Sequence, residues 1–342
     1  MLYAACGVLI MTYDEILFWL TDGDFDHLTV WADRVRREFC GEDVHLRGLI
    51  EFSNHCSRAC GYCGLRQANS KLERYRMSLA EIFAAVQRAD TLGYGTVVLQ
   101  SGEDKDYSIS AYCDLLNRIK QQTGCAVTLC IGEKTREEYQ ALRGAGMDRY
   151  LLRFETSDPD LFAQIKPDSS YENRLRCLRD LKSLGVQTGS GIMVGLPGQT
   201  AESLARDILL MRDLDLDMIG LGPFLSHPQT PLAGAPNGLL ELSLRVLALT
   251  RIVTRNTHMP ATTAMGSLDP LGRQKALKAG ANVLMPNVTP QKYRAFYEIY
   301  PNKICVNDQP GDCRTCISAM VQSLGRTIAG GPGHSLKAVT RG

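Results

Sequence analysis

The chain has 342 residues, 44% of them hydrophobic and 22% charged, with a formal net charge of +1. These values are typical of a globular protein with one large α/β domain or two smaller domains. A nearly neutral chain offers no basic face to nucleic acid or to an anionic membrane, and no apolar run approaches the roughly 18 residues of a membrane span. We therefore expect no nucleic-acid partner and no membrane partner.

Residues 1–10 are apolar, but they lack the basic start and the small-residue cleavage site of a signal peptide. We predict a cytoplasmic protein in which these residues have little structural role. Met11 looks like a more natural beginning, because Thr12 can cap a following helix. Residues 11–46 are predicted to be helical, with Gly41 as a helix stop.

Short apolar runs alternate with longer amphipathic stretches through most of the remaining chain. Strand-then-helix units in succession predict a parallel sheet, and eight of them can close into a (β/α)8 TIM barrel of this length. The periodicity alone is also compatible with an open, doubly wound sheet. The expected strands are 46–52, 95–100, 126–131, 149–154, 187–194, 217–222, 259–264 and 282–286, and the expected helices are 78–92, 108–122, 135–145, 171–184, 200–214, 239–254 and 270–279.

The predicted barrel has an extension at each end. We expect an N-terminal helical extension over residues 1–45, the barrel over 46–290 and a C-terminal extension over 291–342. The glycine-rich tail 330–333 is expected to be flexible. Barrels of this kind place their active site at the carboxyl ends of the strands, and the predicted strands here end in polar residues.

Twelve cysteines are many for a chain without an export signal, so reduced thiols that bind metal are expected rather than disulfides. Cys56, Cys60 and Cys63 form a C-x3-C-x2-C motif directly after the first predicted barrel strand. Three thiolates can hold three irons of a cubane 4Fe–4S cluster and leave the fourth iron open. A zinc site would want four ligands. An open iron favours chemistry on a bound small molecule over plain electron transfer.

A second group of three cysteines lies near the end of the chain. Cys305, Cys313 and Cys316 have the spacing C-x7-C-x2-C. The short C-x2-C spacing is typical of a metal site, and we expect a second iron–sulfur cluster here, either 4Fe–4S or 2Fe–2S.

The first motif has an aromatic residue, Tyr62, two positions after its second cysteine. This motif resembles the cysteine motif of the radical S-adenosylmethionine enzymes. The resemblance implies that S-adenosylmethionine chelates the open iron and is cleaved reductively to a 5′-deoxyadenosyl radical. Glu155 and Arg174 are among the cofactor-binding residues that it implies, and the alternative to a cofactor role for these two is a surface ion pair. The resemblance implies that the catalytic residues are Cys56, Cys60 and Cys63, and that the cofactor-binding residues are Tyr62, Ser101, Gly102, Glu103, Glu155 and Arg174.

A finer resemblance covers nearly the whole chain and is to the HydE family of FeFe-hydrogenase maturation. It is carried by Glu51–Asn54, Cys63–Arg66, Leu99–Asp104, Met193–Thr200 and Pro260–Gly266. It implies an anaerobic role in assembly of the H-cluster diiron subcluster, with the radical attacking a cysteine-bound Fe(CO)2(CN) substrate. The implied partners are HydG-type and HydF-type maturases and an electron donor such as ferredoxin or flavodoxin.

An anionic iron complex needs positive charge and hydrogen-bond donors around it. The resemblance implies that the residues lining its cavity are Thr128, Arg149, Arg153, Thr262, Thr263 and Tyr300.

Two other classes of function compete with this interpretation. A methylornithine synthase-like or biotin synthase-like radical enzyme would share the barrel and the first cysteine motif. An electron-transfer or scaffold protein would conflict with the open cluster and the polar strand ends.

Overall fold

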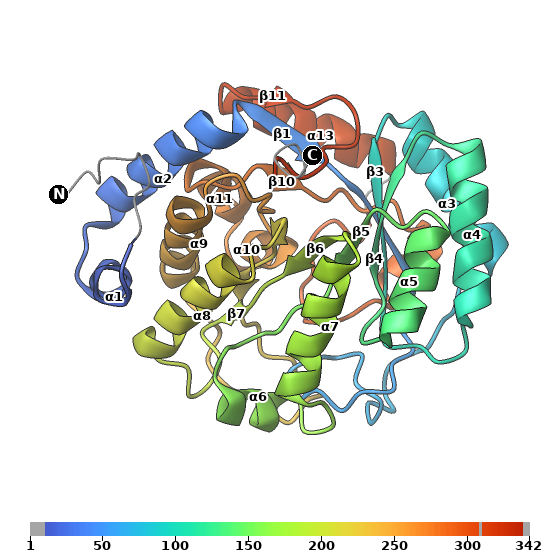
Figure 1. The fold of residues 1–342 in the computed structure, drawn as a ribbon, viewed down its shortest axis with the longest axis horizontal. Helices are drawn as coiled ribbons and strands as arrows, with labels where there is room; N and C mark the ends of the chain where they lie inside the picture. Colours follow the sequence, from blue (N-terminus) through green and yellow to red (C-terminus); the bar gives the residue numbers. More distant parts are fainter. Residues whose placement is uncertain (1–10, 308–309, 338–342) are drawn as a thin grey trace.

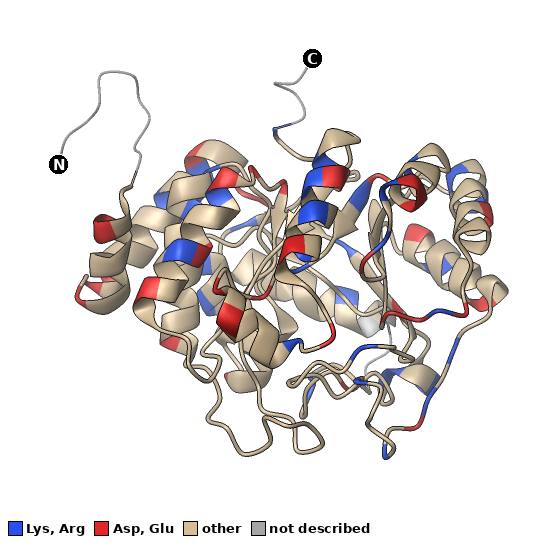
Figure 2. Ribbon diagram, turned by 60° about the horizontal axis from the view of Figure 1, so that its bottom comes forward, with Lys and Arg blue, Asp and Glu red and all other residues tan. Residues whose placement is uncertain are grey.

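The computed structural model describes residues 11–307 and 310–337. Helices flank a central set of strands, and the long connection between β2 and α3 runs along the bottom of the view in Figure 1. Acidic and basic residues are interspersed over the outer helices (Figure 2). Among the described residues, no helix has the length and apolarity that crossing a membrane requires.

The central sheet is parallel, as predicted, and contains six strands in the order β2-β3-β4-β5-β6-β8. Two further segments close it into a barrel. His258 forms a parallel bridge with Met218 of β8, and Pro260 forms one with Val283 of β10. Asn287 then bridges Leu49 of β2, which returns the wall to its first strand. The closed parallel wall confirms the barrel and excludes the open sheet.

The barrel strands and their helices alternate along the chain in the order that the sequence predicts. Strand residues such as Ile50, Val97 and Val127 are fully buried against helix residues such as Ile82 and Ile119. Burial of such side chains stabilises the fold by about 1.5–3 kcal/mol each. The elements are β2 Gly48–Ser53, α3 Leu79–Thr91, β3 Thr96–Ser101, α4 Ile109–Gln122, β4 Ala126–Cys130, α5 Arg136–Gly144, β5 Arg149–Leu151, α6 Pro159–Ile165, α7 Tyr171–Ser183, β6 Gln187–Ser190, β7 Met193–Val194, α8 Ala201–Asp213, β8 Met218–Ile219, β9 Gly222–Pro223, α9 Leu240–Thr254, α10 Thr263–Leu268, α11 Gly272–Lys278 and β10 Val283–Leu284.

The N-terminal segment forms two helices rather than one, α1 Tyr13–Thr21 and α2 Phe25–Cys40. Thr12 caps α1 through a reciprocal capping box with Glu15, as expected, and Asp24 caps α2. Gly41 ends α2 with a φ of 71°, a conformation that glycine adopts without strain.

Two strand predictions differ from the structure. Residues 43–46 form β1 (Asp43–Leu46), which pairs with β10 and β11 and which the helical interpretation of 11–46 missed. The strand expected over 259–264 is reduced to bridges, because α10 begins at Thr263 and Pro260 has no N–H to donate to a ladder.

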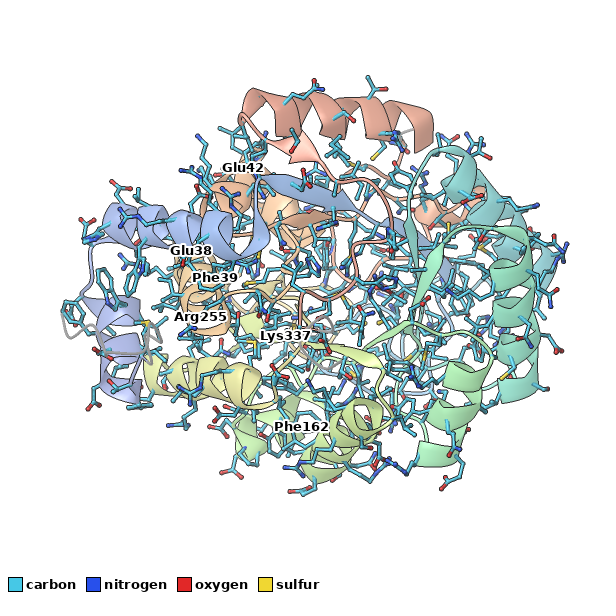
Figure 3. The ribbon with its side chains drawn as sticks, turned by 45° about the horizontal axis from the view of Figure 1, so that its top comes forward. Glu38, Phe39, Glu42, Phe162, Arg255 and Lys337 are labelled. Carbon is cyan, nitrogen blue, oxygen red and sulfur yellow. The ribbon has the colours of Figure 1, made fainter. Side chains whose placement is uncertain are left out.

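The C-terminal part lies by β1 and contains α12 Gln291–Arg294, α13 Pro310–Ser323 and β11 Thr327–Ile328. The division into extensions and barrel stays a prediction, and residues 1–10 lie outside the described part. The expectation that the tail 330–333 is flexible is wrong for Pro332 and Gly333, whose carbonyls accept hydrogen bonds from the barrel. The Pro332 carbonyl accepts hydrogen bonds from Thr96 and Arg149, and Lys337 donates to Asp215. In Figure 3 Lys337 lies over this amino end of the barrel.

Candidate active site

The cysteine motif lies in the loop that follows β2, at the carboxyl end of the barrel strands. Two backbone amides fix this loop on either side of Cys60. The Ala59 amide donates to Asp168 Oδ2 at 2.8 Å, and the Gly61 amide donates to the Ile165 carbonyl at 2.8 Å. The loop conformation is therefore set by the segment between α6 and α7.

The three thiols are shielded from solvent and close enough to influence one another. Cys60 is buried, and Cys56 and Cys63 are half-buried. Burial raises the pKa of Cys63, and negative charge on Cys60 or Cys56 would raise that pKa further. Burial also raises the pKa of Cys56. Because thiols bind metal as thiolates, binding of iron would release protons from these side chains.

The second strand of the site passes directly against the cysteine loop. Gly102 follows β3, and a Cβ atom added to it would lie 2.3 Å from the His55 carbonyl oxygen. The Glu103 amide donates to Cys56 Sγ at 3.4 Å. Only glycine fits at 102, and the polar segment Ser101–Glu103 is held beside the first cysteine.

A buried ion-pair network lies beside this segment. Arg174, only 3% exposed, pairs with Glu133 at 3.0 Å, and its distance to Glu103 is 3.9 Å. Arg58 of the cysteine loop pairs with both carboxylates, at 2.7 Å to Glu103 and 2.8 Å to Glu133. Although burial raises the pKa of Glu133, Arg174 and hydrogen bonding lower it below its usual value. The surface ion pair considered for Arg174 does not apply, because its side chain is buried.

Glu155 occupies a strained position after β5. Its φ is 68°, which is uncommon for a residue with a side chain, and it is held there by a parallel bridge to Ile192. Its carboxylate accepts a hydrogen bond from the Tyr62 hydroxyl at 3.2 Å and pairs with Arg153 at 3.2 Å. Burial raises the pKa of Tyr62, as does the negative charge of Glu155.

The contacts continue from Tyr62 to the cluster motif. Lys166 Nζ lies 3.2 Å from the Tyr62 hydroxyl and 3.3 Å from Cys60 Sγ. A continuous polar chain therefore runs from Arg153 through Glu155, Tyr62 and Lys166 to Cys60.

Three of the residues predicted to bind substrate have a buried polar atom without a hydrogen-bond partner among the described residues. These atoms are Thr128 Oγ1, Thr262 Oγ1 and Arg153 Nε. Thr262 precedes α10 but makes no side-chain cap, and Thr263 begins that helix. Burial raises the pKa of the Tyr300 hydroxyl, and the side chains of Ser267 and Thr263 lower it. Buried polar atoms without partners are costly in a native protein unless a water or ligand satisfies them.

The Arg149 side chain is not directed toward these residues, although its backbone pairs in register with Thr128 of β4. Arg149 is the first residue of β5, so it lies at the amino end of the barrel, where its guanidinium donates to Thr96 Oγ1 and to the Pro332 and Gly333 carbonyls. The resemblance assigned Arg149 to the substrate cavity, whereas these contacts direct its guanidinium to the opposite end of the barrel.

Sequence reasoning missed four residues at this site. Arg58, Glu133, Lys166 and Asp168 all contact the cysteine loop or the ion-pair network. Glu133 directly follows a predicted strand and Arg58 lies within the motif, so their positions carried a signal. Nothing in the local pattern around Lys166 or Asp168 marked them.

Known proteins with similar sequences settle the family. The sequence profile of the Radical SAM superfamily matches residues 50–211. The chain is 50% identical over 295 residues to the FeFe hydrogenase maturase subunit HydE of Thermotoga maritima, over 86% of this chain and 84% of that protein. The chain belongs to the HydE family.

The chain is also similar, at lower identity, to proteins that are not named HydE. A 3-methylornithine synthase of Methanosarcina acetivorans is 26% identical over 266 residues, covering 77% of this chain and 75% of that protein. The crystal structure of methylornithine synthase (PylB) matches with a TM-score of 0.82 at 22% identity, over 94% and 95% of the two chains. HydG from Carboxydothermus hydrogenoformans matches with 0.71 at 19% identity, over 81% of this chain and 67% of that chain. At these identities the two structures show the shared barrel.

Membership in the HydE family makes the chain a radical S-adenosylmethionine enzyme, and the family implies a 4Fe–4S cluster and S-adenosylmethionine. The residues present fit both groups. Three neighbouring thiols lie on one loop, and Gly102 leaves the backbone open beside Cys56. Within 11–307 and 310–337, no three His, Cys, Asp or Glu side chains converge on one metal ion. A cubane does not require that, because each thiolate binds a different iron.

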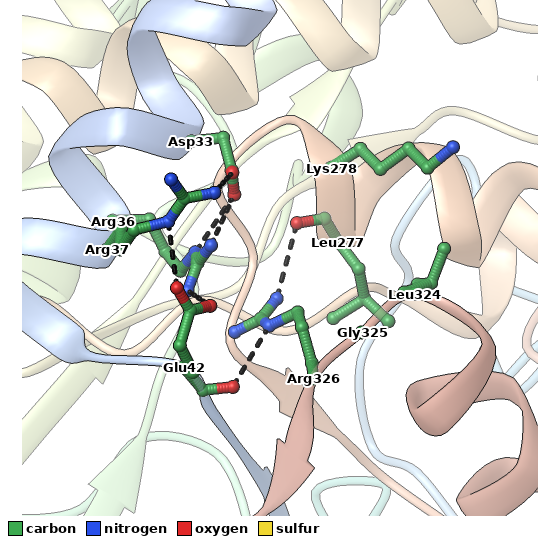
Figure 4. Close-up of a pocket in the computed structure, with 9 residues that line it drawn as sticks. All are labelled: Asp33, Arg36, Arg37, Glu42, Leu277, Lys278, Leu324, Gly325 and Arg326. Atoms are coloured by element: carbon green, nitrogen blue, oxygen red, sulfur yellow. Dashed lines mark hydrogen bonds and ion pairs between the residues drawn. The ribbon is translucent and has the colours of Figure 1, made fainter.

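A pocket of about 130 Å³ lies elsewhere, by β1 and β11 (Figure 4). Arg36 pairs there with Asp33 at 2.7 Å and Glu42 at 2.8 Å. Arg326 donates to the Leu277 and Ala281 carbonyls. Arg36 is thus satisfied by two carboxylates and Arg326 by backbone carbonyls, which is typical of a structural contact.

Proposed function

We propose that this protein acts in maturation of FeFe-hydrogenase, in assembly of the H-cluster diiron subcluster. The 50% identity to the Thermotoga maritima maturase over most of both chains is the observation that carries the proposal. When bound, the cluster and S-adenosylmethionine supply a 5′-deoxyadenosyl radical. The protein's own part is to position this cofactor against the substrate and to keep water out.

We infer that Cys56, Cys60 and Cys63 hold the cluster. In this proposal the methionine end of the cofactor contacts the segment Ser101–Glu103, and Arg174, kept charged by Glu133, lies near the cofactor carboxylate. Arg174 is oriented by ion pairs rather than by solvent, so it is preorganised for an anionic group. In the same proposal Glu155 and Tyr62 bind the cofactor, and the ion pair between Glu155 and Arg153 connects the cofactor site to the substrate site.

The proposed substrate is a cysteine-bound Fe(CO)2(CN) complex whose sulfur is attacked by the radical. An anion rich in acceptors would satisfy Thr128 Oγ1, Thr262 Oγ1 and Arg153 Nε, which lack partners among the described residues. Thr263 and Tyr300 form the neighbouring wall. Arg149 has no part in this proposal.

We also propose a second cluster at Cys305, Cys313 and Cys316. Cys313 and Cys316 lie three positions apart on α13, so their side chains share one face of the helix. Cys305 has a φ of 63° in the loop before it. Cys313 is buried and Cys316 is exposed, so the proposed cluster would lie near the surface.

The proposed partners are a HydG-type maturase that supplies the iron complex, a HydF-type acceptor and a ferredoxin or flavodoxin in the cytoplasm. The test is to co-express an FeFe-hydrogenase with all three maturases and, in a second culture, with this protein omitted. We expect hydrogen evolution only when it is present. Activation without it, or conversion of lysine to methylornithine by the purified protein, would contradict the proposal.

A further inference from the structure

Lys166 is a buried cation beside the cluster motif. It is 5% exposed, and its Nζ contacts Cys60 Sγ at 3.3 Å and the Tyr62 hydroxyl at 3.2 Å. Its Nζ also lies 5.6 Å from the centre of the Tyr62 ring. Through the described parts of the chain, no carboxylate forms an ion pair with this ammonium group.

The backbone around Lys166 is fixed to the cysteine loop at two points. Ile165 and Asp168 accept the Gly61 and Ala59 amides, so the residues flanking Cys60 are tied to residues flanking Lys166. Lys166 itself ends α6, where its amide donates to the Phe162 carbonyl, and Pro167 prevents the helix from continuing. The contact between Lys166 and Cys60 is therefore a rigid feature of the fold.

A buried ammonium group is costly unless a negative group faces it. Here the facing group is Cys60, whose sulfur would bind iron as a thiolate. We propose that Lys166 is a positioning residue that donates a charged hydrogen bond to the cluster thiolate of Cys60 and raises the reduction potential of the cluster.

The direction follows from electrostatics. A cubane with three thiolates carries a net negative charge, and uptake of one electron makes that charge more negative. A fixed positive charge at this distance stabilises the reduced form more than the oxidised form, and hydrogen bonds to cluster sulfur act in the same direction. The step involves one electron from the reductant and no change in any covalent bond.

The proposal for Lys166 rests on the 4Fe–4S cluster that the family implies and not on hydrogenase maturation. Either proposal can therefore be wrong while the other is correct. The test is a dithionite titration of reconstituted Lys166→Met, Lys166→Arg and wild-type holoprotein, followed by electron paramagnetic resonance. The signal to titrate is the one that changes when S-adenosylmethionine is added. At the wild-type midpoint potential we expect the reduced-to-oxidised ratio of Lys166→Met to fall at least tenfold, which is about 59 mV for one electron. Lys166→Arg should stay near the wild-type value.

Lys134→Met provides a matched control. Lys134 is a half-buried lysine of the same rim, and its Nζ donates to the Ile131 and Glu133 carbonyls rather than to a thiol. Its loss should move the midpoint much less. If Lys166→Met does not load iron, Lys166→Gln removes the same charge while it keeps a polar end. A neutral variant with the wild-type midpoint, or an equal fall in Lys166→Arg, would overturn the proposal.

Discussion

Gly102 and Cys56 lie in such close contact that a Cβ atom on Gly102 would be 2.7 Å from the Cβ atom of Cys56. Gly102→Ala must therefore displace the cysteine loop or the end of β3. We expect the rate of S-adenosylmethionine cleavage to fall about 100-fold, because shifts of about 1 Å at a reacting centre have such effects. The measurement is 5′-deoxyadenosine release per bound cluster.

Gly124→Ala is the control for this substitution. A Cβ atom at Gly124 would meet only Asp90 Oδ1, at 3.8 Å, so its cleavage rate should remain at the wild-type level. If Gly102→Ala cleaves S-adenosylmethionine at the wild-type rate, the close contact between Gly102 and Cys56 does not determine the position of the cysteine loop.

Glu133→Gln removes the main counter-charge of a buried arginine. Arg174 would keep only the carboxylate of Glu103, at 3.9 Å, and we expect a loss of about 3 kcal/mol in the free energy of unfolding. Chemical denaturation measures this loss, with the exposed Glu137→Gln as a control that should differ little from the wild type.

The effect of Glu133 should also depend on pH. Because the folded state lowers the pKa of Glu133, its stabilisation is fully present above the unfolded pKa of about 4.3 and is lost as pH falls through the folded value. The difference between wild type and Glu133→Gln should therefore shrink on acidification below that range. A difference that grows in acid would contradict the assignment.

Thr128→Val separates binding from stability. Thr128 Oγ1 is buried and lacks a described partner, so its replacement by a methyl group should leave stability unchanged or raise it by about 1 kcal/mol. Hydrogenase activation should nevertheless fall if this hydroxyl binds substrate.

Thr188→Val is the matched control for Thr128→Val. The Thr188 hydroxyl is equally buried but donates to the Val186 carbonyl at 2.9 Å, so this variant should lose about 1 kcal/mol. A larger loss of stability in Thr128→Val than in Thr188→Val would show that Thr128 has a structural partner.

The double variant Cys313→Ser/Cys316→Ser tests the second cluster. Iron per chain after anaerobic reconstitution should fall from about eight to about four if both sites hold cubanes. Cleavage of S-adenosylmethionine should persist, because it depends on the first motif. An unchanged iron content would remove the second cluster from the proposal.

Arg149→Met tests the role that the structure gives this residue. Its loss leaves the Pro332 and Gly333 carbonyls with fewer donors, and we expect about 2 kcal/mol of destabilisation. Hydrogenase activation per folded protein, measured by co-expression, should match that of the wild type. A selective loss of activation would return Arg149 to the predicted substrate cavity.

The barrel was predictable because its strands are short apolar runs and its helices have caps that can be recognised within four residues, such as Ser78 with Glu81 at the start of α3. The strand β1 was not, since Asp43 and His45 interrupt its apolar pattern and its pairing depends on β11 at the far end of the chain. The same limit applies to the site. The cysteine spacing is local, whereas Lys166 meets Cys60 across 106 positions, and only the closed barrel brings such residues together.

The contacts of Arg47 have a consequence for the order of folding. This arginine is 1% exposed, and one of its nitrogens donates to the Gly333 carbonyl, 286 positions later in the chain. During synthesis the barrel strands leave the ribosome long before that carbonyl does, and domains begin to fold as they emerge. The Arg47 side chain at the floor of the barrel therefore stays hydrated until Gly333 has been synthesised, and the Gly333 carbonyl then takes the place of water at this nitrogen.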